Sequence, residues 1–126
     1  MIPVQTGEAP AAVGPYSQAV RIGDWLYLSG QIALIPATGA LVAGGVEAQV
    51  HQVMKHIGAI LRAAGADYGH LVKTTLYLVD LNHFAQVNEI YAQYVRPPFP
   101  ARSTLGVGAL PKGGLVAVDG VAWLGQ

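Results

Sequence analysis

The chain has 126 residues, the length of one domain, and its seven basic and seven acidic side chains give zero formal net charge. Lysine and arginine form no cluster, which argues against nucleic acid as a partner, because that binding depends on clustered cations. Cysteine is absent, which excludes disulfides and thiolate metal sites. Although 52% of the residues are hydrophobic, no apolar run approaches the roughly 20 residues that span a bilayer. We expect a single cytoplasmic domain over residues 1–126 that does not enter membranes, and its apolar surplus indicates contacts between subunits.

The N-terminal half predicts an extended segment, a strand region and a long helix. Residues 1–15 are rich in Pro and Gly, which favours extended or looping chain. Residues 20–35 predict strand structure interrupted by a turn at Gly23 and Asp24. Residues 46–64 predict a helix that stops at Gly65, because apolar side chains recur there at steps of three and four: Val46, Val50, Val53, Ile57, Ile60, Leu61 and Ala64.

The C-terminal half predicts a strand, a second helix and two more strands. Residues 71–79 are apolar at both alternating positions, as in a strand buried on both faces. Asp80 or Asn82 can cap a helix that extends to about Val95 and ends before the prolines at 97 and 98. Residues 101–109 and 115–123 then predict two strands, which we expect to form a hairpin through residues 111–114.

The predicted order of elements is strand, strand, helix, strand, helix, strand, strand. Two helices can cover one face of such a sheet, yet several strands are apolar on both faces. The uncovered face therefore has to meet another copy of the chain, and we expect an oligomer that packs sheet against sheet.

Two charged residues lie in the otherwise apolar final strands, Arg102 and Asp119. A charge in such surroundings is costly unless it is paired or solvated. Arg102 could face water at a sheet edge or bind the backbone of a neighbouring subunit. Asp119 could lie on a solvated edge or form an ion pair with Lys112 or Arg102. Alternatively, both residues could belong to a functional site. A hairpin register that pairs position 104 with position 119 puts Arg102, Thr104 and Asp119 on one face, and a slip of one residue separates them.

Other common site chemistries have little support. His51 and His56 are five residues apart on the predicted helix and so face different sides, whereas a metal pair needs a spacing of four. Serine and cysteine nucleophiles with a neighbouring base are not indicated, and the glycine pairs lack a phosphate-loop pattern. We expect neither a metal nor a cofactor.

Several motifs, in this order along nearly the whole chain, resemble the reactive intermediate deaminase (Rid, or YjgF) family. They are Gly14-Pro15-Tyr16-Ser17-Gln18-Ala19, Leu28-Ser29-Gly30-Gln31-Ile32, Val72-Lys73-Thr74-Thr75 with Asp80-Leu81, Val87-Asn88-Glu89-Ile90-Tyr91, Phe99-Pro100-Ala101-Arg102-Ser103 and Leu110-Pro111-Lys112. The resemblance implies an α+β, chorismate-mutase-like fold: a mixed β-sheet with two helices packed on one face, assembled as a homotrimer with clefts between subunits. It also implies cofactor-free hydrolysis of 2-imino acids, such as 2-aminoacrylate, to 2-oxo acids and ammonia.

The same resemblance implies roles for individual residues. Arg102 would bind the substrate carboxylate and Asp119 would orient the attacking water, while the substrate pocket would be lined by Tyr16, Ser29, Gly30, Asn88 and Thr104. Two positions depart from the family pattern. The acidic residue is usually glutamate, and aspartate is shorter by roughly 1.3–1.5 Å; position 104 is often cysteine. The shorter carboxylate leaves a second hypothesis open, a trimeric module that binds small carboxylates without turnover. Ribonuclease activity, attributed to parts of the family, is disfavoured by the absence of basic clusters.

Overall fold

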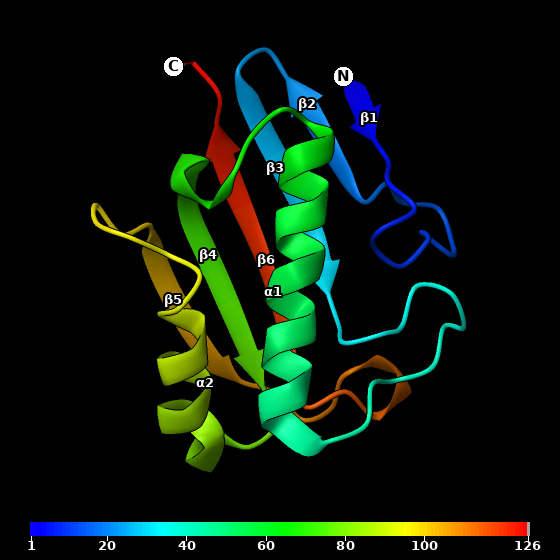
Figure 1. Ribbon diagram of the computed structural model, residues 1–126, viewed down its shortest axis with the longest axis vertical. Coiled ribbons are helices and arrows are strands. Elements are labelled where there is room, and N and C mark those ends of the chain that lie inside the picture. Colours follow the sequence, from blue (N-terminus) through cyan, green and yellow to red (C-terminus); the bar gives the residue numbers. More distant parts are fainter. Residues whose placement is uncertain (126) are drawn as a thin grey trace.

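Six strands form one mixed sheet in the computed structural model, which describes residues 1–125 (Figure 1). Their spatial order is β1-β2-β3-β6-β4-β5. The strands are β1 Ile2–Val4, β2 Ala19–Ile22, β3 Trp25–Gln31, β4 Leu71–Leu78, β5 Ala101–Gly106 and β6 Val116–Trp123. The α-helices of this part of the chain are α1 Gly45–Ala63 and α2 Phe84–Tyr91, and neither is long and apolar enough to cross a membrane. The short strand β1 lies within residues 1–15, for which the sequence predicts extended or looping chain.

The expected strands and the long helix are confirmed to within a few residues. β2 and β3 pair antiparallel around Gly23, whose φ of 57° suits a residue without a Cβ. Helix α1 buries its apolar stripe against β3 and β6, and the chain leaves it through Gly65 at φ 79°. The sequence pattern was reliable here because helix periodicity is a local property.

The second helix is shorter than predicted. Asp80 caps a 3-10 turn, Leu81–His83, by accepting a hydrogen bond from the Asn82 backbone N–H at 2.9 Å, and α2 follows immediately. After Tyr91 the backbone closes i→i−3 hydrogen bonds, from Gln93 to Ile90 and from Tyr94 to Tyr91, so the chain tightens out of α-helical geometry. The helix therefore ends four residues before Val95.

The expected hairpin between the last two strands is wrong. β5 pairs in parallel with β4, β6 pairs antiparallel with the other side of β4, and β4 separates them. The β4–α2–β5 segment is a crossover unit, in which a helix connects two neighbouring parallel strands. Residues Pro111–Gly113 form a 3-10 turn that starts the return of the chain from the sheet edge to its middle, where β6 is buried between two neighbours.

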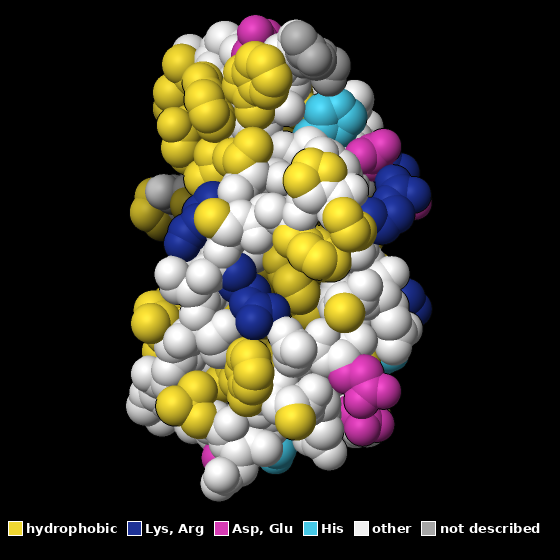
Figure 2. Space-filling model, turned by 90° about the vertical axis from the view of Figure 1, so that its left-hand side faces the viewer, with side chains coloured by type: hydrophobic (Ala, Val, Ile, Leu, Met, Phe, Trp, Pro, Cys, Tyr) yellow, Lys and Arg dark blue, Asp and Glu magenta, His cyan; other side chains and the backbone are white. Residues whose placement is uncertain are grey.

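Both helices cover the same face of the sheet, which confirms the predicted layer arrangement (Figure 1). The main core lies between this face and α1, with Leu26, Ile57, Ile60, Leu76 and Val118 essentially without exposure. On the opposite face, apolar side chains remain 40% to 53% exposed. We call them the open-face patch: Ile22, Trp25, Tyr27 and Trp123. The two indole rings lie 6.5 Å apart, and Figure 2 shows hydrophobic side chains gathered on this side, at the upper left of the view.

Candidate active site

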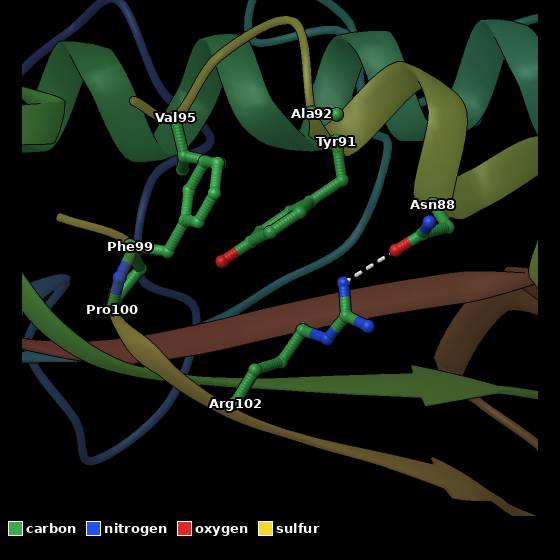
Figure 3. Close-up of a pocket in the computed structure, with 7 residues that line it drawn as sticks. All are labelled: Asn88, Tyr91, Ala92, Val95, Phe99, Pro100 and Arg102. Carbon is green, nitrogen blue, oxygen red and sulfur yellow. Dashed lines mark hydrogen bonds between the residues drawn. The ribbon is translucent and has the colours of Figure 1, made fainter. Parts of the chain in front are cut away.

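Arg102 projects from the edge strand β5 toward helix α2. Its Nη1 donates a hydrogen bond of 2.6 Å to Oδ1 of Asn88 (Figure 3). Its Cζ atom lies 5.5 Å from the centroid of the Phe84 ring and 5.3 Å from that of Tyr91. A guanidinium within about 6 Å of an aromatic ring is attracted by the ring's quadrupole. The charge is thus held by one amide and two rings, all contributed by α2.

The support behind this arginine is itself fixed. Tyr91 is buried, and its hydroxyl shares a 2.7 Å hydrogen bond with Oγ1 of Thr74 on β4. Thr74 is the partner of Arg102 in the parallel β4–β5 register, so it projects on the same, helix-covered side of the sheet. Because strand, threonine, tyrosine and arginine are linked in this way, the guanidinium has a defined orientation before any ligand binds.

A cavity of about 410 Å³ opens beside the guanidinium. It is lined by Asn88, Tyr91, Ala92, Val95, Phe99, Pro100 and Arg102 (Figure 3). Within residues 1–125, Asn88 is the hydrogen-bonding partner of Nη1, and the Nε and Nη2 groups have no such partner. This free edge has the geometry that binds a carboxylate through two parallel hydrogen bonds. We call this cavity the arginine pocket.

Asp119 projects from the opposite face of the sheet. In the register of β4, Thr74 pairs with Arg102, whereas the next residue, Thr75, pairs with both Ser103 and Asp119. Successive side chains of a strand point to opposite faces, so Arg102 and Asp119 do too. The register that would put Arg102, Thr104 and Asp119 on one face is therefore wrong, and the reason is that β4 lies between their strands.

Asp119 lines a second and larger cavity of about 900 Å³, which we call the aspartate pocket. Its wall also includes two of the predicted residues, Tyr16 and Gly30. Much of the remainder is apolar and comes from loops: Pro10, Ala11, Val13, Ile32, Leu34, Pro36, Leu110 and Pro111. Asp119 accepts a 2.9 Å hydrogen bond on Oδ2 from the hydroxyl of Tyr77 on β4.

Within one chain, the seven predicted site residues thus do not line a single pocket. Arg102 and Asn88 line the arginine pocket, and Tyr16, Gly30 and Asp119 line the aspartate pocket. Ser29 lines neither; its Oγ donates a 2.6 Å hydrogen bond to the Ser17 carbonyl, which ties β3 to the loop that carries Tyr16. Thr104 is half-buried on the helix-facing side of β5 and also lines neither pocket.

Sequence reasoning missed three side chains that shape these pockets: Phe84 and Tyr91 under the guanidinium, and Tyr77 against Asp119. The sequence could have indicated Phe84 and Tyr91, since both lie on the predicted apolar side of that helix, one turn away from Asn88. It could not have indicated Tyr77, because the contact of Tyr77 with Asp119 depends on the pairing of β4 with β6.

Two of the four histidines contribute to packing. His51 Nδ1 lies 2.8 Å from the Tyr94 hydroxyl, and His56 Nε2 lies 2.6 Å from the Leu34 carbonyl oxygen. Among residues 1–125, no group of three or more His, Cys, Asp or Glu side chains could hold a metal ion.

The fold and these pockets define an α+β domain with two helices on one face of a mixed sheet and, on the edge strand, an arginine oriented by one amide and two rings. A family model described as Endoribonuclease L-PSP matches residues 6–124, and the chain belongs to this family, which includes the YjgF/Rid proteins. It is 50% identical over 119 residues to 2-iminobutanoate/2-iminopropanoate deaminase of Homo sapiens, covering 94% of this chain and 87% of that protein. RidA from Psychrobacter superposes with a TM-score of 0.91 at 44% identity, covering 95% and 97% of the two chains. TdcF of E. coli, solved with bound serine, gives a TM-score of 0.91 at 35% identity, covering 98% of each chain.

Proposed function

We propose that this protein is an enamine/imine deaminase, which hydrolyses 2-imino acids such as 2-iminopropionate to 2-oxo acids and ammonia. The observation that carries the proposal is the free edge of the Arg102 guanidinium, held by Asn88 and two rings beside an open pocket. Relatives at about half identity carry the name of this activity. A fixed arginine of this kind suits a small substrate whose constant feature is a carboxylate.

The proposed reaction needs little beyond orientation and proton transfer. An enamine such as 2-aminoacrylate first takes a proton on carbon and becomes the imine. Water then adds to the imine carbon while a proton reaches nitrogen, and the resulting tetrahedral carbinolamine loses ammonia to leave the 2-oxo acid. Arg102 holds the carboxylate, and Asp119 accepts a hydrogen bond from the attacking water and takes its proton. This sequence balances without a cofactor, so we propose none.

We propose further that two copies of the chain complete each site. Arg102 and Asp119 leave opposite faces of the sheet, so one protomer cannot bring them to one small substrate. The open-face patch supplies a surface on which a second copy could pack, and burying indole rings is strongly favourable. A closed ring of three copies, the homotrimer implied by the resemblance, would repeat this contact at three equivalent clefts.

The test uses imines generated from amino acids by an amino-acid oxidase, with semicarbazide trapping whatever imine remains. The wild-type protein should lower the semicarbazone yield and accelerate ammonia release. Arg102→Ala should lose about 100-fold or more in kcat/KM, because two charge-assisted hydrogen bonds disappear. Arg102→Lys is the matched control: it keeps the charge but not the fork, and should retain only part of the activity. Full activity of Arg102→Ala, in a folded oligomer, would remove the carboxylate clamp.

A second candidate is a module that binds small carboxylates without turning them over. The shortened side chain of Asp119 favours it, and TdcF with bound serine is a relative that holds such a ligand. This alternative predicts that 2-oxobutanoate raises the melting temperature while ammonia release stays at the uncatalysed rate. Nucleic acid is the weaker candidate despite the family's description, because the zero net charge and dispersed cations offer little for phosphate binding.

A further inference from the structure

The hydrogen bond between Tyr77 and Asp119 joins two strands across the open face of the sheet. Tyr77 on β4 pairs with Ala117 on β6, and Asp119 lies two residues further along β6, on the same face. Such diagonal neighbours are within reach of a long aromatic side chain. The Tyr77 hydroxyl donates to Oδ2 of Asp119 at 2.9 Å.

Both partners of this hydrogen bond line the aspartate pocket. Two other tyrosine hydroxyls serve the packing of the core: that of Tyr68 donates to the Met54 carbonyl at 2.7 Å, and that of Tyr91 is bonded to Thr74. Tyr77 instead directs its hydroxyl to a carboxylate at the wall of an open cavity. Its contact therefore shapes a surface that a ligand can reach.

The hydroxyl of Tyr77 remains a donor at neutral pH. The hydrogen bond to Asp119, followed by burial, raises the pKa of Tyr77 above its ordinary value of 10.0, so the phenol keeps its proton. With Oδ2 occupied in this way, the other carboxylate oxygen, Oδ1, has no hydrogen-bond donor within residues 1–125. A carboxylate held through one oxygen has a restricted rotation, and its free oxygen has a defined position.

We propose that Tyr77 is a positioning residue for the hydrolysis, whose hydroxyl holds Oδ2 of Asp119 so that Oδ1 accepts the hydrogen bond of the attacking water. This inference rests on the proposed function and adds a residue to it. A short aspartate has few torsions, so a single donor is enough to orient it. Tyr77 acts through Asp119 and does not exchange a proton with the substrate.

A double-mutant cycle on the full-length protein tests the proposal. Tyr77→Phe, Asp119→Asn and the double variant are compared with wild type in the semicarbazide assay, with kcat and KM for 2-iminobutanoate measured separately. Tyr77→Phe should lower kcat about 10-fold, the order expected for one charge-assisted hydrogen bond. Its KM should stay within about 2-fold of wild type, because Arg102 still binds the carboxylate. In the Asp119→Asn background, Tyr77→Phe should cause no further loss, since the group that it positions is gone.

Tyr68→Phe is the matched control. It also removes a tyrosine hydroxyl that donates a hydrogen bond, to the Met54 carbonyl, but Tyr68 lines neither pocket, and kcat should be unchanged. Melting temperatures of all variants show whether a loss reflects folding.

Three outcomes would overturn the proposal. The first is a folded Tyr77→Phe variant with wild-type kcat. The second is a full 10-fold loss on adding Tyr77→Phe to Asp119→Asn, which would mean that Tyr77 acts independently of the carboxylate. The third is a wild-type protein that fails to accelerate imine hydrolysis, which would remove the proposed function as well. An active wild type together with an unaffected Tyr77→Phe removes only the role of Tyr77.

Discussion

Arg102 and Asp119 leave the sheet from opposite faces, on strands that β4 separates. Thr74 pairs with the arginine and Thr75 with the aspartate, so one step along β4 changes the face. Adjacent strands lie about 4.8 Å apart, which puts roughly 10 Å of sheet between the two backbones. A substrate the size of 2-iminopropionate cannot touch both side chains of one protomer.

This separation predicts complementation between two inactive variants. Arg102→Ala retains Asp119, and Asp119→Asn retains Arg102, so a mixed oligomer contains some clefts with both groups intact. If equal amounts of the two variants mix at random in a ring, about a quarter of the clefts should be intact, and the activity should be about a quarter of that of the wild type. The measurement is ammonia release after the two proteins are unfolded together and refolded. The double variant mixed with wild type serves as the control for dilution, and no recovery above the two single variants would contradict a shared site.

The Arg102–Asn88 hydrogen bond predicts an unusual order of two substitutions. Asn88→Ala removes the acceptor of Nη1 and should raise KM about 10-fold, because the guanidinium is no longer oriented. Asn88→Asp should raise KM further, since a carboxylate at this place forms an ion pair with Arg102 and competes with the substrate carboxylate. Steady-state kinetics measure both effects. Asn82→Ala, an exposed amide in the turn before α2, is the control and should leave KM unchanged.

The open-face patch predicts how the protein associates. Trp25→Asp puts a charge next to Trp123 on a surface that we expect to be buried between copies, so the oligomer should dissociate and lose activity. Light scattering after size exclusion measures the mass. Lys55→Asp introduces the same side chain on the exposed side of α1 and should leave the mass unchanged. A Trp25→Asp protein with the wild-type mass would place the interface elsewhere.

His56 predicts a pH dependence of stability. Its ring is 1% exposed, Nε2 is bonded to the Leu34 carbonyl, and Nδ1 is buried without a partner within residues 1–125. Burial lowers the pKa of His56 below its ordinary 6.5, although the bond to Leu34 opposes this. The unfolded chain therefore binds a proton at a higher pH than the folded protein does. The contribution of neutral His56 to the free energy of unfolding is fully present above about pH 6.5. It is lost as the pH falls below this value, by up to about 1.4 kcal/mol per pH unit.

The check is urea unfolding between pH 7.5 and pH 5. His56→Gln keeps an N–H donor but cannot titrate, so its free energy of unfolding should fall less steeply than that of the wild type. Gln52→Ala removes the other side chain that is bonded to the Leu34 carbonyl but no titratable group, and it should retain the wild-type slope. Parallel slopes for wild type and His56→Gln would contradict this role.

Gly58 predicts a destabilising substitution within α1 in spite of the better helix propensity of alanine. A Cβ at this position would overlap the hydroxyl of Tyr68 and lie 2.7 Å from its ring Cζ, in a core where that hydroxyl donates to Met54. Gly58→Ala should therefore lower the free energy of unfolding by about 1–3 kcal/mol, in contrast to the gain of about 1 kcal/mol at an open helical site. Chemical denaturation measures it. Gly7→Ala, which meets open space, should change stability by less than about 0.5 kcal/mol.

Local patterns of residues predict which segments form helices and strands, and which charged side chain is unexpected in an apolar strand. The apolar stripe from Val46 to Leu61 and the apolar, β-favouring run Leu71–Leu78 depend on neighbours a few residues apart, so the sequence pattern shows them directly. Arg102 was visible as a cation in an apolar strand, and the motif resemblance assigned it to the carboxylate.

Which side chains meet is visible only in the folded protein. Strand order puts β4 between β5 and β6. Strand register then makes Arg102 face α2 and Asp119 face the open side, and it brings Tyr77 within reach of Asp119. The two side-chain hydrogen bonds involved, Arg102–Asn88 and Tyr77–Asp119, join residues 14 and 42 positions apart. Side chains of one strand alternate between the two faces of the sheet whichever strands lie beside it, and a shift of one residue in register moves each side chain to the other face. Local sequence patterns therefore cannot specify such contacts.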